Sequence, residues 1–148
     1  MTEFNHKSDA DTLARTIYGE ARGEPRRGKV AIANVILRRV NTDIWGDNKP
    51  DWWGEGVAGI CLKPWQFTCW HESDPNRKQI IEVTATNQTF QECRIIAELA
   101  LDGLLVDVTD GATHYHAKGL SPAWIKKANL CAEVGKHLFY RDVEPGVK

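Results

Sequence analysis

The chain has 148 residues, of which 26% are charged and 42% hydrophobic, and its formal net charge is -1. This size predicts one domain over residues 1–148, with a core large enough to need no metal or disulfide. The near-neutral charge disfavours nucleic-acid binding through bulk positive charge. The most apolar run, residues 30–37, is far shorter than the roughly 18 residues of a membrane span, so no membrane partner is expected. Residues 1–15 lack the apolar segment of a secretory signal, so we expect the chain to be made and folded in a cytoplasm.

Two helices are predicted in the first forty residues. Ser8 is expected to cap a first helix, whose apolar side chains recur at helical spacing until Gly23 and Pro25 end it. Pro25 suits the first turn of a second helix. Residues 30–40 of that second helix are apolar around most of its circumference, which predicts a buried central helix.

The following stretch, residues 41–64, is rich in turn residues, and only residues 57–62 are expected to form a short helix. A later helix is predicted from a capping box formed by Thr89 and Glu92, and it should stop at Gly103.

Short strands are predicted at residues 112–116 and 134–140, with a helical turn between them that starts at Pro122 and carries Trp124. The predicted fold is therefore a single α+β domain, mainly α, with a few short strands.

The aromatic and sulfur residues leave alternatives open. Four of the six tryptophans, at positions 45, 52, 53 and 65, fall in one turn-rich stretch. Such a cluster either fills the core or forms a platform for a ligand such as a sugar ring. The four cysteines, at positions 61, 69, 93 and 131, show no zinc-binding spacing and are expected to be free thiols.

Glu20 is the first candidate for chemistry. It lies in the last turn of the first predicted helix, where the helix dipole and the neighbouring Ile17 and Tyr18 favour a protonated carboxyl group. A general acid needs such a setting, although a surface glutamate paired with an arginine would fit the same spacing. Glu24 fits a catalytic role and a structural role at the start of the second helix equally well.

Several blocks together resemble one known family. The first block runs from Leu13 to Val40 and contains Gly-Glu-Ala-Arg-Gly-Glu at residues 19–24. Four further blocks follow in order, at residues 57–60, 66–68, 111–116 and 135–140, and Trp124 lies between the last two. In these blocks the chain is similar to the SleB/CwlJ-type cell-wall hydrolase domain. It departs from the family at His114 and His116, at Arg38, and in the tryptophan-rich insert.

The resemblance implies a lysozyme-like domain that cleaves the glycan strands of peptidoglycan, often by lytic transglycosylation, with Glu20 as the catalytic acid. The expected bond is the β-1,4 bond between N-acetylmuramic acid and N-acetylglucosamine. A hydrolytic version would need a second carboxylate, and the candidates are Glu24, Glu55 and Asp74. No metal and no cofactor are expected, and the chain should act as a monomer on peptidoglycan. The residues expected to bind the substrate are Tyr18, Glu24, Gln66, Phe67, Thr68, His114, Tyr115, His116 and Trp124.

The tryptophan-rich loop from Trp45 to Trp70 is expected to form one wall of the substrate groove, facing Glu20. Truncating Trp52 or Trp53 to alanine should then weaken glycan binding about 5- to 70-fold with little change in melting temperature. A role in the core predicts the reverse result.

Two rival functions remain open. A zinc amidase would use His114 and His116, which an extended strand points to one side, together with His137. A non-catalytic glycan-binding module would use the tryptophans and would not need Glu20. Within the family, the chain resembles a small phage endolysin more than a spore-cortex enzyme. Such an endolysin is stored in the cytoplasm of the producing cell and is released to act on the wall.

Overall fold

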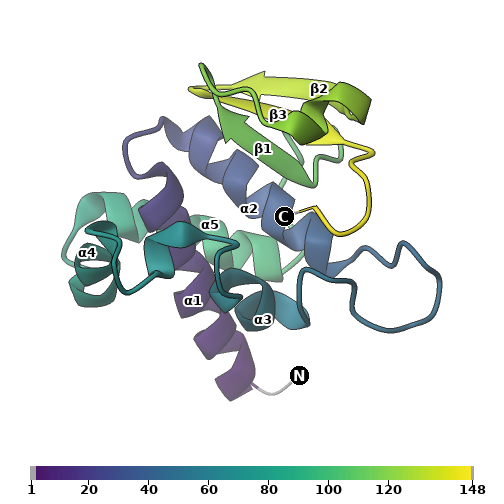
Figure 1. Ribbon diagram of the computed structural model, residues 1–148. Helices are drawn as coiled ribbons and strands as arrows, with labels where there is room; N and C mark the ends of the chain where they lie inside the picture. Colours follow the sequence, from purple (N-terminus) through teal and green to yellow (C-terminus); the bar gives the residue numbers. More distant parts are fainter. Residues whose placement is uncertain (1–2, 148) are drawn as a thin grey trace.

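A bundle of helices lies beneath a small sheet in the computed structural model, which describes residues 3–147 with side chains from Ser8 onward (Figure 1). The mainly helical α+β class predicted from the sequence is confirmed. The helices are α1 (Glu3–Ala21), α2 (Arg26–Val40), α3 (Gly56–Leu62), α4 (Asn76–Glu82) and α5 (Gln88–Leu101), and the strands are β1 (His114–Ala117), β2 (Asn129–Val134) and β3 (His137–Arg141). Two short 3₁₀ helices, η1 (Thr68–Trp70) and η2 (Ala123–Lys127), complete the described elements.

The centre of the bundle is α1, which contacts all four other helices. Leu13, Ala14 and Ile17 on this helix are fully buried. The helix begins at Glu3, so Ser8 lies inside it and is not its N-cap. The predicted start was wrong because the capping signature at Ser8 competes with a helical run that already extends through it.

The predicted central helix, α2, is confirmed, with Pro25 as the residue that precedes it. Five of its apolar residues are fully buried: Ala31, Ile32, Ala33, Val35 and Ile36. The helix contacts α1, α3 and α5 and also reaches β2, so it joins the bundle to the sheet (Figure 1).

The predicted capping box of α5 is corrected by the structure. The N-cap is Asn87, whose side-chain oxygen accepts a hydrogen bond of 2.9 Å from the Phe90 amide. Glu92 instead forms ion pairs with Lys29 at 3.0 Å and with Arg26 at 3.2 Å. It therefore ties α5 to α2, an interaction between distant segments that a local motif could not indicate.

The three strands form an antiparallel sheet in the order β1-β3-β2. Val134 pairs with His137, which leaves Gly135 and Lys136 as a two-residue turn. Gly135 has a φ of +56°, the left-handed conformation that such tight hairpin turns favour at glycine. The strand predicted at 134–140 was therefore wrong in extent, because it runs across this turn; β2 and α4 were not predicted.

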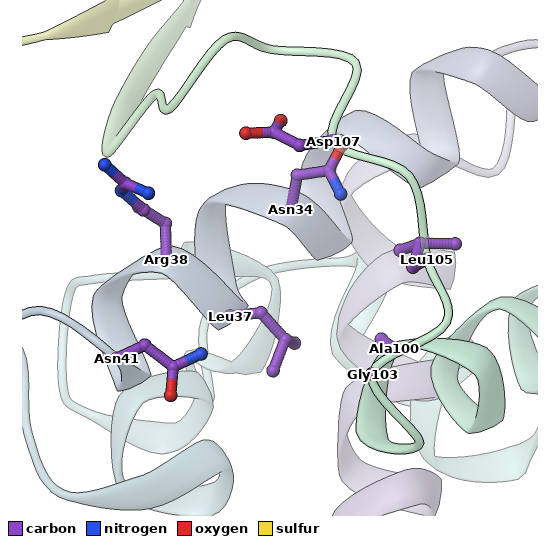
Figure 2. Close-up of a pocket in the computed structure, with 8 residues that line it drawn as sticks. All are labelled: Asn34, Leu37, Arg38, Asn41, Ala100, Gly103, Leu105 and Asp107. Atoms are coloured by element: carbon purple, nitrogen blue, oxygen red, sulfur yellow. The ribbon is translucent and has the colours of Figure 1, made fainter.

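The segment that leads into β1 is held against α2. The Asn34 side chain donates to the Val106 carbonyl at 3.1 Å and accepts from the Val108 amide at 2.9 Å. Asp107 then accepts from the amides of Thr109 and Gly111, which shapes the turn before β1. Figure 2 shows the pocket of about 230 Å³ that this arrangement leaves between α2 and the end of α5. Its lining residues come from the C-terminal half of α2 and its C-cap Asn41 and from residues 100–107. Glu20, in contrast, precedes the N-terminal end of α2.

The described cysteines are free, as predicted, and Cys61, Cys69 and Cys93 are buried. Burial raises the pKa of Cys61 and of Cys93 to about 12, so both thiols stay protonated and unreactive near neutral pH. Within residues 3–147, none of the helices has the length and apolar character that crossing a bilayer requires.

The tryptophan-rich stretch divides into parts with different environments. Trp53 is 1% exposed, and its ring lies against the Arg39 guanidinium at 5.3 Å. Trp52 is half-buried and donates its indole N–H to the Val147 carbonyl. Trp45 and Trp65 are the exposed members, at 57% and 62%. The loop that carries residues 41–55 extends from the C-terminal end of α2 (Figure 1). Because the Trp53 side chain is part of the hydrophobic core, the prediction that it binds a sugar is wrong.

Replacing Trp53 with alanine should lower the free energy of unfolding by about 3 to 5 kcal/mol, because a large buried ring leaves a cavity. Trp45→Ala is the matched control, and it should change stability by less than about 0.5 kcal/mol because the ring is mostly exposed. Chemical denaturation of the two variants checks this. Equal stabilities would contradict the assignment of Trp53 to the core.

Candidate active site

Glu20 lies in the last turn of α1, half-buried where this helix meets η1. The preceding residue, Gly19, makes that contact possible. A Cβ atom at position 19 would lie 2.8 Å from the Cys69 Sγ and 3.0 Å from a methyl group of Ile80. The missing side chain therefore lets η1 bring the Cys69 thiol up to the Glu20 carboxyl group.

Tyr115 approaches Glu20 from the sheet. Its hydroxyl donates a hydrogen bond to Glu20 Oε1, and the thiol of Cys69 hydrogen-bonds to the same carboxyl group. Burial and the proximity of Glu20 raise the pKa of the Tyr115 hydroxyl well above its ordinary value. The phenol therefore stays protonated and remains a donor to Glu20.

The pKa of Glu20 is raised above its ordinary value, chiefly because burial disfavours the carboxylate. The hydrogen bonds from Tyr115 and Cys69 and the nearby His137 act in the opposite direction, and the negative charge of Asp74 adds to the increase. Burial is the largest of these effects. The site therefore holds a carboxyl group that releases its proton at higher pH than a surface glutamate, as a general acid requires.

Glu24 has a different environment. Its side chain is buried beneath the β2–β3 hairpin, where Oε1 accepts hydrogen bonds from the Lys136 amide at 2.9 Å and from His137 Nδ1 at 3.1 Å. A Cβ atom on Gly135 would lie 2.7 Å from the same carboxylate. The structure therefore places Glu24 in a structural role, holding the hairpin against the α1–α2 junction.

The hairpin also contacts Tyr115, the side chain that binds Glu20. The His137 ring meets the Tyr115 ring edge-on, with centroids 5.2 Å apart. Tyr115 in turn packs against Phe139 on the neighbouring strand and donates to Glu20. Glu24 thus supports Tyr115 indirectly, through the His137 ring that it binds.

The two histidines that flank Tyr115 point to the opposite face of the sheet. His114 is 1% exposed, its Nε2 lies 2.7 Å from the Val147 carbonyl, and burial lowers its pKa to about 4. His116 Nε2 lies 2.9 Å from the Tyr140 hydroxyl. The Trp124 ring lies against both histidines, with centroids 5.3 and 5.9 Å away. The structure therefore does not bring His114, His116 or Trp124 to Glu20.

Three of the four remaining predicted binding residues also have structural partners. Tyr18 is buried and packs edge-on against Phe90. The Gln66 amide donates to the carbonyls of Trp53 and Ile60, at 3.0 and 2.9 Å. Phe67 is buried with its ring 5.7 Å from the Arg39 guanidinium, whereas Thr68 is exposed at the start of η1. Tyr115 is thus the predicted binding residue that the structure places against Glu20.

Two groups around Glu20 were missed or named for another role. Cys69 was interpreted as a plain buried thiol, although it directly follows the family-like block at residues 66–68. His137 was named only as a possible zinc ligand, yet it pairs with Glu24. Within the part of the chain that the structure describes, no group of three or more His, Cys, Asp or Glu side chains is arranged to hold a metal ion.

Comparison with known proteins assigns the family. The model of the Cell Wall Hydrolase family matches residues 23–140, most of this chain. The chain therefore belongs to the cell wall hydrolase family, and the SleB/CwlJ-type resemblance is confirmed.

Two relatives of this chain are spore cortex-lytic enzymes. The chain is 32% identical to the spore cortex-lytic enzyme of Halalkalibacterium halodurans over 89% of its own length, and 31% identical to that of Bacillus subtilis over 89%. These matches span only 34% and 37% of the two relatives.

Two solved structures share the fold. They are the catalytic domain of Bacillus cereus SleB and the catalytic domain of the germination-specific lytic transglycosylase SleB from Bacillus anthracis. Each has a TM-score of 0.67 and 29% identity to this chain, and each comparison covers 91% of it. The comparisons cover 91% and 95% of the two solved chains, so the present chain corresponds to the catalytic part of those proteins.

Replacing Tyr115 with phenylalanine should raise the pKa of Glu20 further, because the hydroxyl that stabilises the carboxylate is removed. The control is Tyr140→Phe, which removes a hydroxyl from the opposite face of the sheet. Titration of the Glu20 carboxyl carbon by NMR in both variants tests this. An unchanged or lower Glu20 pKa in Tyr115→Phe would contradict the described hydrogen bond.

Glu24→Ala should lower the free energy of unfolding by about 3 kcal/mol, because it leaves the Lys136 amide and the His137 ring without their charged acceptor. Glu133→Ala is the matched control on the same hairpin: its exposed ion pair with Lys118 should contribute about 1 kcal/mol at most. Urea denaturation measures both losses. If Glu24→Ala is as stable as Glu133→Ala, Glu24 does not hold the hairpin.

Proposed function

We propose that this domain cleaves the glycan strands of peptidoglycan at the β-1,4 bond between N-acetylmuramic acid and N-acetylglucosamine. The observation that carries the proposal is the environment of Glu20. Its carboxyl group has a raised pKa and accepts a hydrogen bond from the Tyr115 hydroxyl. Membership of the cell wall hydrolase family and the structural likeness to the catalytic domain of a lytic transglycosylase support the same reaction.

In this mechanism Glu20 begins protonated and donates its proton to the bridging oxygen as the glycosidic bond breaks. The transition state resembles an oxocarbenium ion, and the muramic acetamido group helps to stabilise it. Tyr115 and Cys69 hold the resulting Glu20 carboxylate through hydrogen bonds. That carboxylate then accepts the proton of the C6 hydroxyl of the muramic acid ring. The C6 oxygen of this ring bonds to its own C1 and gives a 1,6-anhydro end.

One carboxyl group is enough for this sequence of steps, because it returns the proton that it received. Hydrolysis would instead require a second carboxylate about 5 to 9.5 Å from the first. Of the three candidates from the sequence, Glu24 is occupied beneath the hairpin, and Glu55 lines a pocket beside Arg39 near the C-terminal end of α2. Asp74 is the candidate whose charge acts on Glu20. Transglycosylation is therefore the reaction proposed, and Asp74 is the residue that a hydrolytic reaction would use.

The biological setting that we propose is that of a bacteriolytic phage endolysin, which acts as a monomer and is held in the cytoplasm of the producing cell until release. The net charge of -1 offers little attraction to an anionic cell envelope from outside. Purified protein should lyse cells only after their membrane has been permeabilised; lysis of intact cells at the same rate would contradict this setting.

Glu20→Gln is the direct test of the reaction. The amide cannot donate the required proton, so release of soluble fragments from purified peptidoglycan should fall at least about 100-fold while the melting temperature is retained. Glu82→Gln, on the exposed face of α4, is the control and should keep full activity. A folded Glu20→Gln variant with nearly the activity of the unaltered protein would contradict the assignment.

The same assay separates the two rival functions. An amidase would release stem peptides and lose activity to a chelator, and a binding module would release nothing. Chelator-resistant release of glycan fragments supports the proposed reaction.

A further inference from the structure

Trp65, which is exposed, and His71, which is half-buried, form an aromatic pair outside the residues already assigned to the site. The two rings are stacked, with centroids 3.9 Å apart and an interplanar angle of 29°. Trp65 is 62% exposed although one face of its indole rests on the imidazole. Its other face is therefore open to solvent.

The conformation of Trp65 and the hydrogen bonds of His71 to Ser73 hold the pair in place. Trp65 has a φ of +67°, a left-handed conformation that is rare for a bulky residue and recurs at functional sites. His71 Nδ1 accepts a hydrogen bond of 3.1 Å from the Ser73 amide and lies 2.6 Å from the Ser73 hydroxyl. In the neutral ring Nε2 then carries the hydrogen and is a donor.

The segment that carries this pair also forms one side of the Glu20 site. Cys69, two residues before His71, hydrogen-bonds to Glu20, and Asp74, three residues after it, raises the Glu20 pKa. Asn76 at the start of α4 accepts a hydrogen bond from Arg22, two residues beyond Glu20 in the chain. The aromatic pair thus belongs to a segment that is fixed to the end of α1 on both sides of His71.

We propose that Trp65 and His71 form a sugar-binding subsite for one N-acetylhexosamine ring of the glycan strand, next to the bond that Glu20 cleaves. This inference rests on the proposed function, because it takes the glycan as the ligand. The apolar C–H face of a pyranose ring covers the open face of Trp65. The His71 Nε2–H group lies at the edge of the stack, where it donates to a hydroxyl or acetamido oxygen.

The contact distinguishes a sugar from a stem peptide. A pyranose ring presents a flat face of axial hydrogens to the indole, whereas the peptide stem of peptidoglycan is a chain of small and charged residues with no such face. Trp65 therefore contributes to binding the strand and leaves proton transfer to Glu20.

The experiment measures binding of a chitooligosaccharide and of a free stem peptide by calorimetry, in the Glu20→Gln background so that no cleavage occurs. Adding Trp65→Ala should weaken chitooligosaccharide binding about 10-fold or more, from the loss of one stacked sugar face. Trp65→Phe should restore part of the affinity, and His71→Ala should weaken binding by a smaller factor. In the active protein, Trp65→Ala should raise KM and leave kcat largely unchanged, a split that loss of folding would not produce.

Trp45→Ala is the matched control, since Trp45 is exposed to a similar degree but lies on the loop at the C-terminal end of α2. It should bind as the parent does. Unchanged chitooligosaccharide affinity in a folded Trp65→Ala variant, or a loss of affinity confined to the stem peptide, overturns the subsite. If the unaltered protein releases no glycan fragments, the proposed function fails; if it does release them and Trp65→Ala binds normally, only the subsite is wrong.

Discussion

The buried carboxylate of Glu24 is the interaction on which the site depends. It lies at the junction between α1 and α2 and accepts hydrogen bonds from Lys136 and His137 in a hairpin more than a hundred residues away in sequence. The hairpin turn can lie this close because Gly135 has no side chain. Since β3 pairs with β1, fixing the hairpin also fixes Tyr115 over Glu20. The helical bundle supplies the acid and the sheet supplies its partner, so the two must be held together.

Opposing effects on the pKa of Glu20 determine the chemistry of the site. Hydrogen bonds that favour the carboxylate come from both sides, through Tyr115 on the sheet and Cys69 on η1, while burial favours the protonated acid more strongly. A group in this position can give up a proton and afterwards be stabilised as an anion by donors already in place. The same two donors are suited to both halves of a transglycosylation, in which one carboxyl group acts first as acid and then as base.

Local patterns in the sequence predicted much of the fold. The helical spacing of apolar residues identified α1 and α2, because each buries one face or most of its circumference. The short helix α3 and the later helix α5 were also predicted. One error fell where a distant segment decides the outcome, because Glu92 resembles a capping residue but pairs with Lys29. Two others were local: the first helix already extends through Ser8, and a tight turn directly follows Val134. Glu20 could be proposed from the sequence because the motif that carries it is local. The partners of Glu24, and the placement of His114 and His116 on the far face, depend on strand pairing that the sequence alone did not reveal.

In the proposed reaction Glu20 needs no second carboxylate, and the chemical form of the product tests this. Peptidoglycan digested by the protein in isotopically labelled water can be analysed by mass spectrometry of the new glycan ends. We expect 1,6-anhydro muramic ends that carry no label, because the C6 oxygen of the sugar itself attacks C1. Reducing muramic ends that contain the labelled oxygen would contradict it and would show that water, activated by a second group such as Asp74, is the nucleophile.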